Sequence, residues 1–313
     1  MNRYISSIIA AAIIAAATTG VSAQNDKNDR SPIFSTVVNP VIPQKTEFCG
    51  RTVDLTRADM YERLDRELTS IIYTHGNTLL AIKRANKYFP VIAPILKANN
   101  IPLDFLYLAV VESTLNQRAY SGAKAAGIWQ FIAPTAKQYG LEVSDEVDER
   151  YNLEKATAAA CRYFKKAYQK YGNWESVMAS YNGGMSRIST ELDKQYANSA
   201  FDLYLTDETS RYPFRVMAQK LLMENPEAYG YKISSDQLYR PVECDIVTVS
   251  GPVEDWPAWA KQHGISYAQL REENPWIRAK SLTNKAGKTY KVRVPKKGAL
   301  IRDNQPKTVF KVK

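Results

Sequence analysis

Apolar residues recur at intervals of three and four positions over most of the chain, from about residue 56 to residue 225. One short series contains Leu64 and Leu68, and the longest begins after Asn152 and ends before Gly172. This spacing gathers apolar side chains on one face of a helix, and Asn and Gly are typical residues at its two ends. The pattern predicts helix after helix, and therefore a mainly α chain.

The pattern of the chain changes near Arg240, where short β-branched runs replace the long helical series. Two such runs enclose two short helical stretches, in the order 245–249, 256–263, 266–273 and 290–294. The order predicts a small βααβ module over residues 244–297, and a unit of this size needs close packing to be stable. We expect a basic tail, 298–313, to follow it.

The first 23 residues have the features of a secretory signal peptide. Arg3 precedes a mostly apolar stretch, and small residues stand before Gln24 at the expected cleavage site. No cysteine stands at this site, which argues against a lipoprotein linkage; an uncleaved N-terminal anchor is the alternative. We expect export to the periplasm or cell envelope, with a polar N-terminal arm over 24–55 and a helical domain over 56–235.

The positive charge of the chain is concentrated towards its C-terminus. The whole sequence carries 42 Lys and Arg residues against 32 Asp and Glu, a formal net charge of +10. Residues 240–313 alone contain 15 basic and 7 acidic side chains. In an exported protein this charge favours cell-wall polymers and anionic envelope surfaces over nucleic acid. We therefore expect peripheral envelope association and no nucleic-acid partner.

Histidine and cysteine are scarce, with two and three copies. Two histidines argue against a His-rich zinc site and against most Ser-His-Asp or Cys-His nucleophile systems, so we predict no metal site. Three cysteines permit at most one internal disulfide. Cys161 lies in an alanine-rich helical series and is expected to be a small buried residue. Cys49 and Cys244 are then the candidate pair.

An acidic residue follows directly after the most apolar stretch of the helical domain. Residues 105–111 form an unbroken apolar run, and Glu112 stands at its end. Burial in apolar surroundings and the negative end of a helix dipole both raise the pKa of a carboxyl group. A glutamate that is neutral near pH 7 can serve as a general acid. The alternative is a solvated glutamate at a frayed helix end.

No second carboxylate accompanies Glu112 in the neighbouring sequence, because residues 113–141 contain neither Asp nor Glu. Glycosidases of the usual type place two carboxylates across the bond that they cleave. A more distant partner stays open, and the candidates are Asp104, Glu142 and Glu208.

The segment after Glu112 is rich in residues suited to binding a sugar. Glycines allow tight turns, aromatic rings offer faces and edges, and Ser and Gln side chains form hydrogen bonds. The residues concerned are Gly122, Gly127, Gly140, Trp129, Phe131, Tyr139, Ser121 and Gln130. Together they predict a saccharide groove, although Trp129 by itself is more typical of a core.

Four sequence motifs occur in order between residues 112 and 212. They are Glu112-Ser113; Ser121-Gly122-Ala123 with Gly127-Ile128-Trp129-Gln130 and Pro134-Thr135-Ala136; Ala179-Ser180-Tyr181-Asn182-Gly183-Gly184; and Glu208-Thr209-Ser210-Arg211-Tyr212. The set resembles the signature of the family-1 lytic transglycosylases, whose fold is lysozyme-like, and in particular their membrane-bound lytic transglycosylase D subgroup. Two positions depart from the pattern: Ser180 replaces the usual alanine, and Pro213 follows Tyr212.

The resemblance implies a reaction and a role for individual residues. The implied reaction cleaves the β-1,4 bond from N-acetylmuramic acid to N-acetylglucosamine in peptidoglycan glycan strands. It uses neither water nor a cofactor and leaves a 1,6-anhydro ring. Glu112 matches the single catalytic acid and base, and Tyr181 matches the tyrosine whose hydroxyl approaches it. The matched glycan-binding and groove residues are Ser121, Gln130, Tyr181, Asn182, Glu208 and Tyr212.

Residues 245–295 resemble a LysM domain, a small βααβ unit that binds polymers containing N-acetylglucosamine. The matching residues include His263-Gly264-Ile265-Ser266 and Asn274-Pro275, whereas the segment 250–255 departs from the usual opening turn. Two interpretations follow: the module binds the glycan, or its basic charge alone holds the protein near the cell wall.

Two other functions stay open on the sequence alone. A hydrolytic muramidase of the same fold would use a distant carboxylate to activate water. A non-catalytic peptidoglycan-binding or scaffold protein would keep the groove without turnover, and the presence of Glu112 weighs against it.

Overall fold

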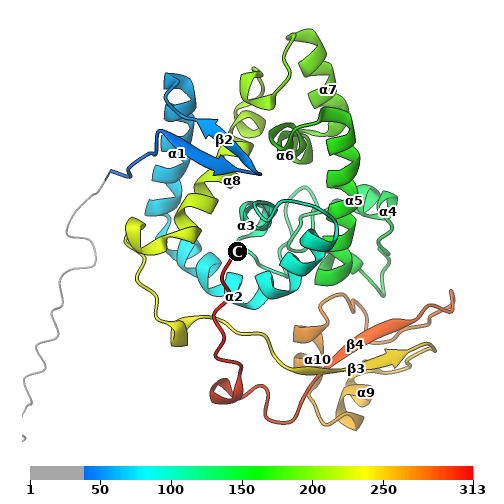
Figure 1. Cartoon of the computed structure of the whole chain (residues 1–313). Helices are drawn as coiled ribbons and strands as arrows, with labels where there is room; N and C mark the ends of the chain where they lie inside the picture. The colour runs from blue at the N-terminus through cyan, green and yellow to red at the C-terminus, as the bar shows by residue number, and fades with distance from the viewer. Residues whose placement is uncertain (1–38, 313) are drawn as a thin grey trace, which may run out of the picture. The chain divides into compact units, whose positions relative to one another are not determined.

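The computed structural model describes residues 39–312, and most of this range before the C-terminal module is helical (Figure 1). The helices are α1 (Ala58–Tyr73), α2 (His75–Ala98), α3 (Phe105–Ser113), α4 (Ala133–Gln138), α5 (Leu153–Tyr171), α6 (Trp174–Gly183), α7 (Met185–Lys194) and α8 (Asp207–Glu224). The predicted mainly α class is confirmed. The predicted signal peptide, residues 1–23, lies outside the described residues.

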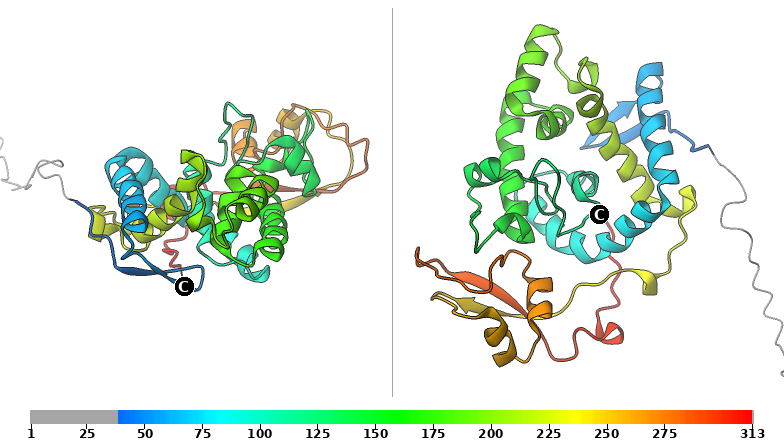
Figure 2. Two further views of the ribbon diagram at one scale, coloured as in Figure 1. Left: turned by 90° about the horizontal axis from the view of Figure 1, so that it is seen from above. Right: turned by 180° about the vertical axis from the view of Figure 1, so that it is seen from behind.

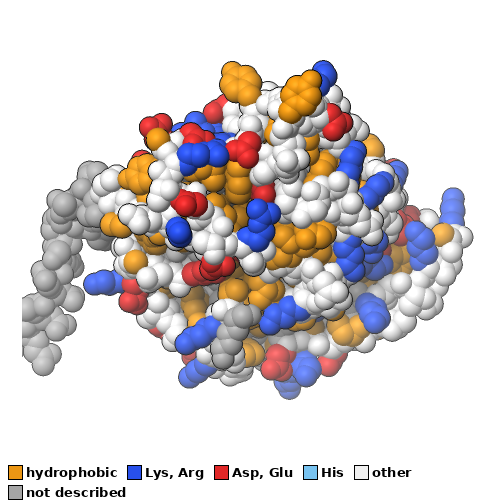
Figure 3. Space-filling model, turned by 45° about the horizontal axis from the view of Figure 1, so that its top comes forward, with side chains coloured by type: hydrophobic (Ala, Val, Ile, Leu, Met, Phe, Trp, Pro, Cys, Tyr) orange, Lys and Arg blue, Asp and Glu red, His pale blue; other side chains and the backbone are white. Residues whose placement is uncertain are grey.

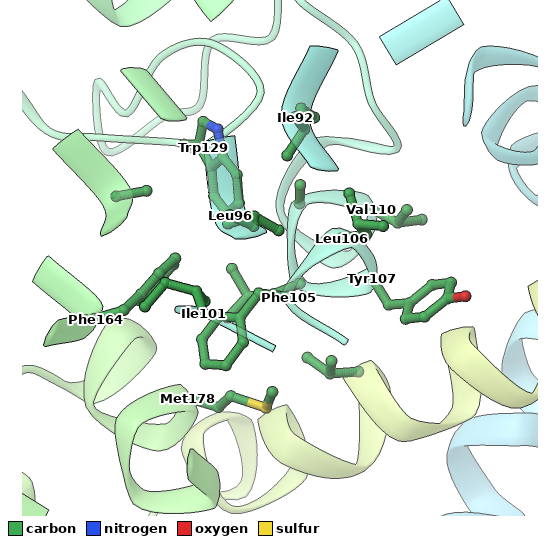
Figure 4. Close-up of a cluster of buried hydrophobic side chains, with 14 of the residues drawn as sticks. Ile92, Leu96, Ile101, Phe105, Leu106, Tyr107, Val110, Trp129, Phe164 and Met178 are labelled. Atoms are coloured by element: carbon green, nitrogen blue, oxygen red, sulfur yellow. The ribbon is translucent and has the colours of Figure 1, made fainter. Parts of the chain in front are cut away.

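Helix α3 lies at the centre of the hydrophobic core, where α2 and α8 pack against it (Figures 1 and 2). Every residue from 105 to 110 is at most 2% exposed. Figure 4 shows side chains of this helix together with Trp129 and Phe164 in one cluster. Residues 105–110 of the apolar run are therefore buried on all sides of the helix, whereas Val111 is partly exposed. The helix is also the rigid support that carries Glu112.

The ends of α5 follow from two residues that the sequence singles out. The Asn152 side chain accepts a hydrogen bond from the backbone N–H of Lys155, which satisfies one of the unpaired donors at the start of the helix. Gly172 adopts a left-handed conformation with φ of 69°, which closes the helix at a residue without a Cβ. Both predicted ends of this helix are confirmed.

An antiparallel hairpin precedes the helices, where the sequence predicts only a polar arm. Strands β1 (Lys45–Phe48) and β2 (Arg51–Asp54) pair with Phe48 opposite Arg51. The two-residue turn, Cys49-Gly50, has positive φ at both positions, which suits a tight hairpin. Phe48 and Leu55 attach it to the helical core at 3% and 1% exposure. These two anchors are too few to give a visible alternation in the sequence.

The three cysteines are free thiols, so the candidate disulfide between Cys49 and Cys244 is not formed. Cys49 is buried in the hairpin turn, close to the charges of Asp104 and Glu175. Cys244 begins β3 beside Glu273. The two thiols therefore lie among different neighbours, which the spacing of cysteines in the sequence does not reveal. Cys161 is fully buried in α5, as predicted.

The C-terminal module has the predicted order of strand, two helices and strand. Its elements are β3 (Cys244–Val249), α9 (Trp256–Gln262), α10 (Tyr267–Glu273) and β4 (Tyr290–Pro295). The strands pair antiparallel with Val247 opposite Val292. Trp256, Leu270 and Val292 fill a small core to which Val147 and Tyr151 of the preceding helical region also belong. This shared core supplies the close packing that so small a unit needs.

The tail after β4 returns to the helical domain. It contains a short 3-10 helix, Arg302–Asn304, and then an extended segment. The Phe310 backbone N–H donates to the Asn86 side-chain oxygen at 2.8 Å, and the Phe310 ring lies edge-on to Phe89. Across the described residues, we find no helix with the length and apolar character to span a bilayer.

Candidate active site

A groove of about 1250 Å³ runs beside the end of α3. Its walls come from the 121–139 segment and from α5, α6 and α7, with Glu208 added from the start of α8. Segments that lie up to 96 positions apart in the sequence therefore meet at one cavity. Six predicted site residues line it directly, namely Glu112, Ser121, Gln130, Tyr181, Asn182 and Glu208, whereas Tyr212 lies behind its wall.

Glu112 occupies the last turn of α3, and its side chain is only partly exposed to the groove. The helix ends because Thr114 takes a left-handed conformation with φ of 52°, which is uncommon for a β-branched residue. Burial of the carboxyl group is the largest cause that raises the pKa of Glu112 to about 7. The nearby charge of Glu208 acts in the same direction. A carboxyl group with this pKa can exist in its neutral form near neutral pH.

The hydroxyl of Tyr212 donates a hydrogen bond to Glu112 Oε1. This bond favours the ionised carboxylate and therefore limits the rise of the Glu112 pKa. The family resemblance assigned such an approach to Tyr181, but the Tyr181 hydroxyl donates instead to the Trp129 carbonyl at 2.7 Å. Tyr181 is near enough for the charge of Glu112 to raise the pKa of its phenol, but the hydroxyl that donates to Glu112 is that of Tyr212, at 2% exposure. Tyr181 remains in the groove wall.

The loop between residues 113 and 131 is tied to the end of α3 by side-chain hydrogen bonds. The Ser113 hydroxyl donates to the Ile128 carbonyl at 2.9 Å, and Gln130 Nε2 donates to the Gly127 carbonyl at 2.8 Å. A Cβ at Gly127 would lie 2.0 Å from the carbonyl oxygen of Arg150, so only glycine fits there. These contacts position Gln130 in the wall of the groove that Glu112 also lines.

A second junction joins α6 to α8 at the opposite wall. The Thr209 hydroxyl donates to Asn182 Oδ1 at 2.9 Å, and Asn182 Nδ2 donates to Glu208 Oε1 at 3.3 Å. A Cβ at Gly183 would lie 2.8 Å from the Thr209 methyl group, which explains a glycine at this crossing. The predicted residues Asn182 and Glu208 are therefore direct neighbours.

The aromatic residues predicted for the groove divide into two groups. Phe131 and Tyr139 line the groove. Trp129 is fully buried, and its indole N–H donates to the Thr157 hydroxyl at 2.9 Å. Trp129 is thus a core residue that supports the loop from below, and its proposed contact with a sugar is wrong.

The three distant carboxylates considered as partners of Glu112 lie in different surroundings. Asp104 lies near Lys220, and Glu142 pairs with Lys288 and accepts a hydrogen bond from Tyr290 of the C-terminal module. Only Glu208, of these three, lines the groove with Glu112. Its side chain is exposed.

A buried ion-pair cluster adjoins the part of α8 that carries Tyr212, and the sequence analysis missed it. Glu67 of α1 is 2% exposed. Its carboxylate oxygens lie 2.6 Å from Arg211 Nε, 3.4 Å from Arg215 Nε and 3.2 Å from Arg66 Nε. The spacing of Arg211 and Arg215 by four residues was the one available signal, and it does not name the partner on α1.

Among residues 39–312, no group of three or more His, Cys, Asp or Glu side chains could hold a metal ion.

Two protein-family models match this chain, one in the helical domain and one in the C-terminal module. The family described as transglycosylase SLT domain matches residues 90–203. This chain carries a transglycosylase SLT domain. The family described as soluble lytic transglycosylase C-terminal LysM-like domain matches residues 245–298. The two resemblances predicted from the sequence are confirmed. Glu112, Ser121, Gln130, Tyr181 and Asn182 lie within the SLT domain, whereas Glu67, Glu208 and Tyr212 lie outside the matched range.

Curated relatives agree with these family matches. Membrane-bound lytic murein transglycosylase D of Escherichia coli strain K12 is 32% identical over 243 residues, which cover 76% of this chain and 52% of the relative. The protein of the same name from Escherichia coli O6:H1 matches to the same extent. This chain therefore spans about half the length of the curated relatives it matches.

Among solved structures, an inactive mutant of the lytic transglycosylase Slt from Pseudomonas aeruginosa covers 49% of this chain and 26% of its own. The TM-score is 0.36 and the sequence identity 15%. This structural similarity is too low to support an inference about the SLT domain.

Proposed function

We propose that this chain is a peptidoglycan lytic transglycosylase that cleaves the β-1,4 bond from N-acetylmuramic acid to N-acetylglucosamine. The observation that carries the proposal is the state of Glu112, a single carboxyl group with a pKa of about 7 in the wall of a long groove. A group with this pKa can give up a proton and take one back at neutral pH. The SLT domain and the relatives named above support the same reaction.

In the proposed first step, neutral Glu112 donates its proton to the glycosidic oxygen while the bond from that oxygen to C1 breaks. The 2-acetamido group of the muramoyl residue stabilises the positive charge that develops at C1. Glu112 is then a carboxylate, and the hydrogen bond from Tyr212 stabilises this charged form. Because the acetamido group stabilises the positive charge at C1, the step needs no second carboxylate.

In the second step, the Glu112 carboxylate takes the proton of the C6 hydroxyl on the same sugar, and the C6 oxygen bonds to C1. The attacking oxygen is already tethered to the reacting centre, so the ring closes without activation of water. Glu112 returns to its neutral form, and the product carries a 1,6-anhydro ring. Ser121, Gln130 and Asn182 are proposed to hold the glycan strand in position, because all three line the groove.

A hydrolytic muramidase is the second candidate, because Glu208 shares the groove with Glu112 and could activate water. Its exposure and its hydrogen bond to Asn182 favour a role in the groove wall instead. The two reactions give products that differ by the mass of one water.

An assay on purified sacculi distinguishes these candidate functions. The mature protein and its Glu112→Gln and Glu208→Gln variants are incubated with sacculi, and the released muropeptides are identified by mass. We expect anhydro products from the wild type and from Glu208→Gln, and none from Glu112→Gln. Hydrated products that vanish in Glu208→Gln would establish the muramidase. No release by the wild type would leave a binding or scaffold protein.

We also propose that the chain acts in the cell envelope, after removal of residues 1–23, and that the LysM-like domain binds the glycan. The features of the N-terminal sequence and the LysM-like match support this. The mass of the protein recovered from a periplasmic fraction tests export: a chain that begins at Gln24 is expected, and a full-length chain would contradict cleavage.

A further inference from the structure

Three basic side chains along one wall of the groove belong to no motif discussed above. Lys166 and Lys170 of α5 and Arg187 of α7 line the same cavity as Glu112. All three are exposed, and none of them forms an ion pair with an acidic residue in the range 39–312. Exposed cations usually find acidic neighbours on a protein surface or stay dispersed. Here three of them share one groove with their charges unneutralised.

The lysines continue the face of α5 that reaches towards the reaction centre. Tyr163, on the same helix, lies with its ring 5.1 Å from the ring of Tyr181. Lys166 and Lys170 follow Tyr163 at three and seven positions, so they lie on the same side of the helix. At 1.5 Å per residue they stand roughly 5 and 10 Å further along its axis. The cations therefore begin about one helical turn beyond the aromatic cluster beside Glu112.

The charges of the groove are distributed unevenly between its elements. Among the described residues that line it, the acids are Glu112 from α3 and Glu208 from α8, and the cations all come from α5 and α7. Figure 1 places both helices on the right, and Figure 3 shows Lys and Arg side chains on that side of the molecule as well as at its centre and left. A ligand in the groove thus meets a positive wall on that side.

The N-acetylated sugars of a glycan strand are neutral, so the sugars alone do not explain a wall of three cations. The peptide stems that branch from the muramoyl residues of peptidoglycan carry carboxylates. We propose that Lys166, Lys170 and Arg187 form a subsite for the carboxylate groups of these stems. The inference rests on the proposed function and adds a substrate preference to it, namely strands that carry charged stems.

The test compares two charge states of the same strand. Soluble glycan strands with intact stems are prepared, and one half is treated with carbodiimide and ammonia so that the stem carboxylates become amides. The variant combines Lys166→Gln, Lys170→Gln and Arg187→Gln. The matched control combines Lys97→Gln, Lys194→Gln and Lys232→Gln, which removes three exposed positive charges outside the groove.

Wild type and matched control are expected to cleave untreated strands with a kcat/KM about tenfold above that for amidated strands, since each exposed ion pair contributes modestly. The groove variant is expected to cleave both strands at the lower rate. Its unfolding midpoint should equal that of the wild type, because the three side chains are exposed. Equal preference in the wild type, or an unchanged preference in the groove variant, would overturn the subsite.

A binding measurement keeps this test independent of turnover. In the Glu112→Gln background, the dissociation constants for untreated and amidated strands are measured with and without the three groove substitutions. A tenfold preference for untreated strands that the substitutions remove supports the subsite even if no anhydro product forms. If the wild type forms no anhydro product but binding still favours untreated strands, the proposed reaction alone is refuted. If anhydro product forms but binding does not distinguish untreated from amidated strands, the subsite alone is refuted.

Discussion

Helix α8 contributes side chains to the surroundings of two glutamates, Glu67 and Glu112, and these surroundings differ. Towards α1 it presents Arg211 and Arg215, which together with Arg66 surround the buried carboxylate of Glu67. Towards α3 it presents Tyr212, whose hydroxyl donates to Glu112, and within the described part of the chain Glu112 takes part in no ion pair. One carboxylate is thus paired with three cations, and the other accepts a hydrogen bond from a neutral donor, while the charge of Arg215 acts on it as a minor influence.

The contrast shows that one helix can contribute both to a structural ion-pair cluster and to the candidate active site. The arginines on both sides of Glu67 make its carboxylate an anchor between α1 and α8. A phenol stabilises the charge less strongly, so burial can still raise the pKa of Glu112 to about 7. The same substitution, Glu to Gln, should therefore have opposite effects on stability at the two positions.

The largest expected effect is a gain of stability in Glu112→Gln. Because the folded state raises the Glu112 pKa from 4.5 to about 7, the folded protein binds more protons than the unfolded chain between these values. The wild type therefore loses stability as pH rises from about 4.5 to 7, by up to about 3 kcal/mol. Urea unfolding at pH 4.5 and pH 8 should show equal stability of the two proteins at the lower pH and a more stable variant at the higher pH.

The control for this measurement is Glu62→Gln, an exposed glutamate on α1. It should stay within about 0.5 kcal/mol of the wild type at both pH values. Equal unfolding midpoints of Glu112→Gln and wild type at pH 8 would mean that Glu112 is solvated.

The second effect is a loss of stability in Glu67→Gln. The substitution removes the charge that pairs with three arginines and leaves them next to a neutral amide. Since the arginine side chains are partly exposed to water, we expect a loss of about 2 kcal/mol rather than the full penalty of a buried unpaired charge. Thermal unfolding should show a midpoint lowered by about 5 °C. A midpoint equal to that of Glu62→Gln would contradict an anchoring role.

The smallest effect is expected in Tyr212→Phe, which removes one hydroxyl and leaves the ring. Loss of the hydrogen bond disfavours the ionised form of Glu112, so its pKa rises further above the ordinary value. The alkaline limb of the pH profile of kcat/KM should move to higher pH, and kcat should fall about tenfold because neutral Glu112, now a weaker acid, donates its proton less readily in the first step.

Tyr196→Phe is the matched control, since Tyr196 is 96% exposed and does not line the groove. Its pH profile should coincide with that of the wild type. A Tyr212→Phe variant with an unshifted alkaline limb would show that the hydroxyl does not influence the titration of Glu112.

Elements that depend on local pattern were predicted well from the sequence. The run from Phe105 to Val110 predicts a helix buried on all sides, and Asn152 and Gly172 mark the ends of α5. The βααβ order of the C-terminal module follows from two β-branched runs and two short helical series. The hairpin around Cys49-Gly50 escaped prediction because only Phe48 and Leu55 attach it to the core.

Contacts between distant segments were predicted less well. Glu112 was recognised because its apolar neighbours precede it directly in the sequence, yet its hydrogen-bond partner, Tyr212, lies 100 positions away. Trp129 was named for the groove because an aromatic ring suits a sugar, with a core position as the alternative, and the structure places its ring in the core. The ion pair of Glu67 with Arg215 cannot be assigned from the sequence, because the spacing of the arginines does not name a partner on α1 and the two helices meet only after folding.

The amino-acid sequence alone determined the helical class, the order of the module and the position of one unusual glutamate, because each depends on residues within a few turns of one another. The tertiary structure decided which hydroxyl reaches that glutamate, which glutamate receives the arginines and which cations share its groove. These choices depend on how α1, α3, α5 and α8 cross. Crossing is set by the packing of whole helix faces, and that packing brings together side chains that no local pattern connects.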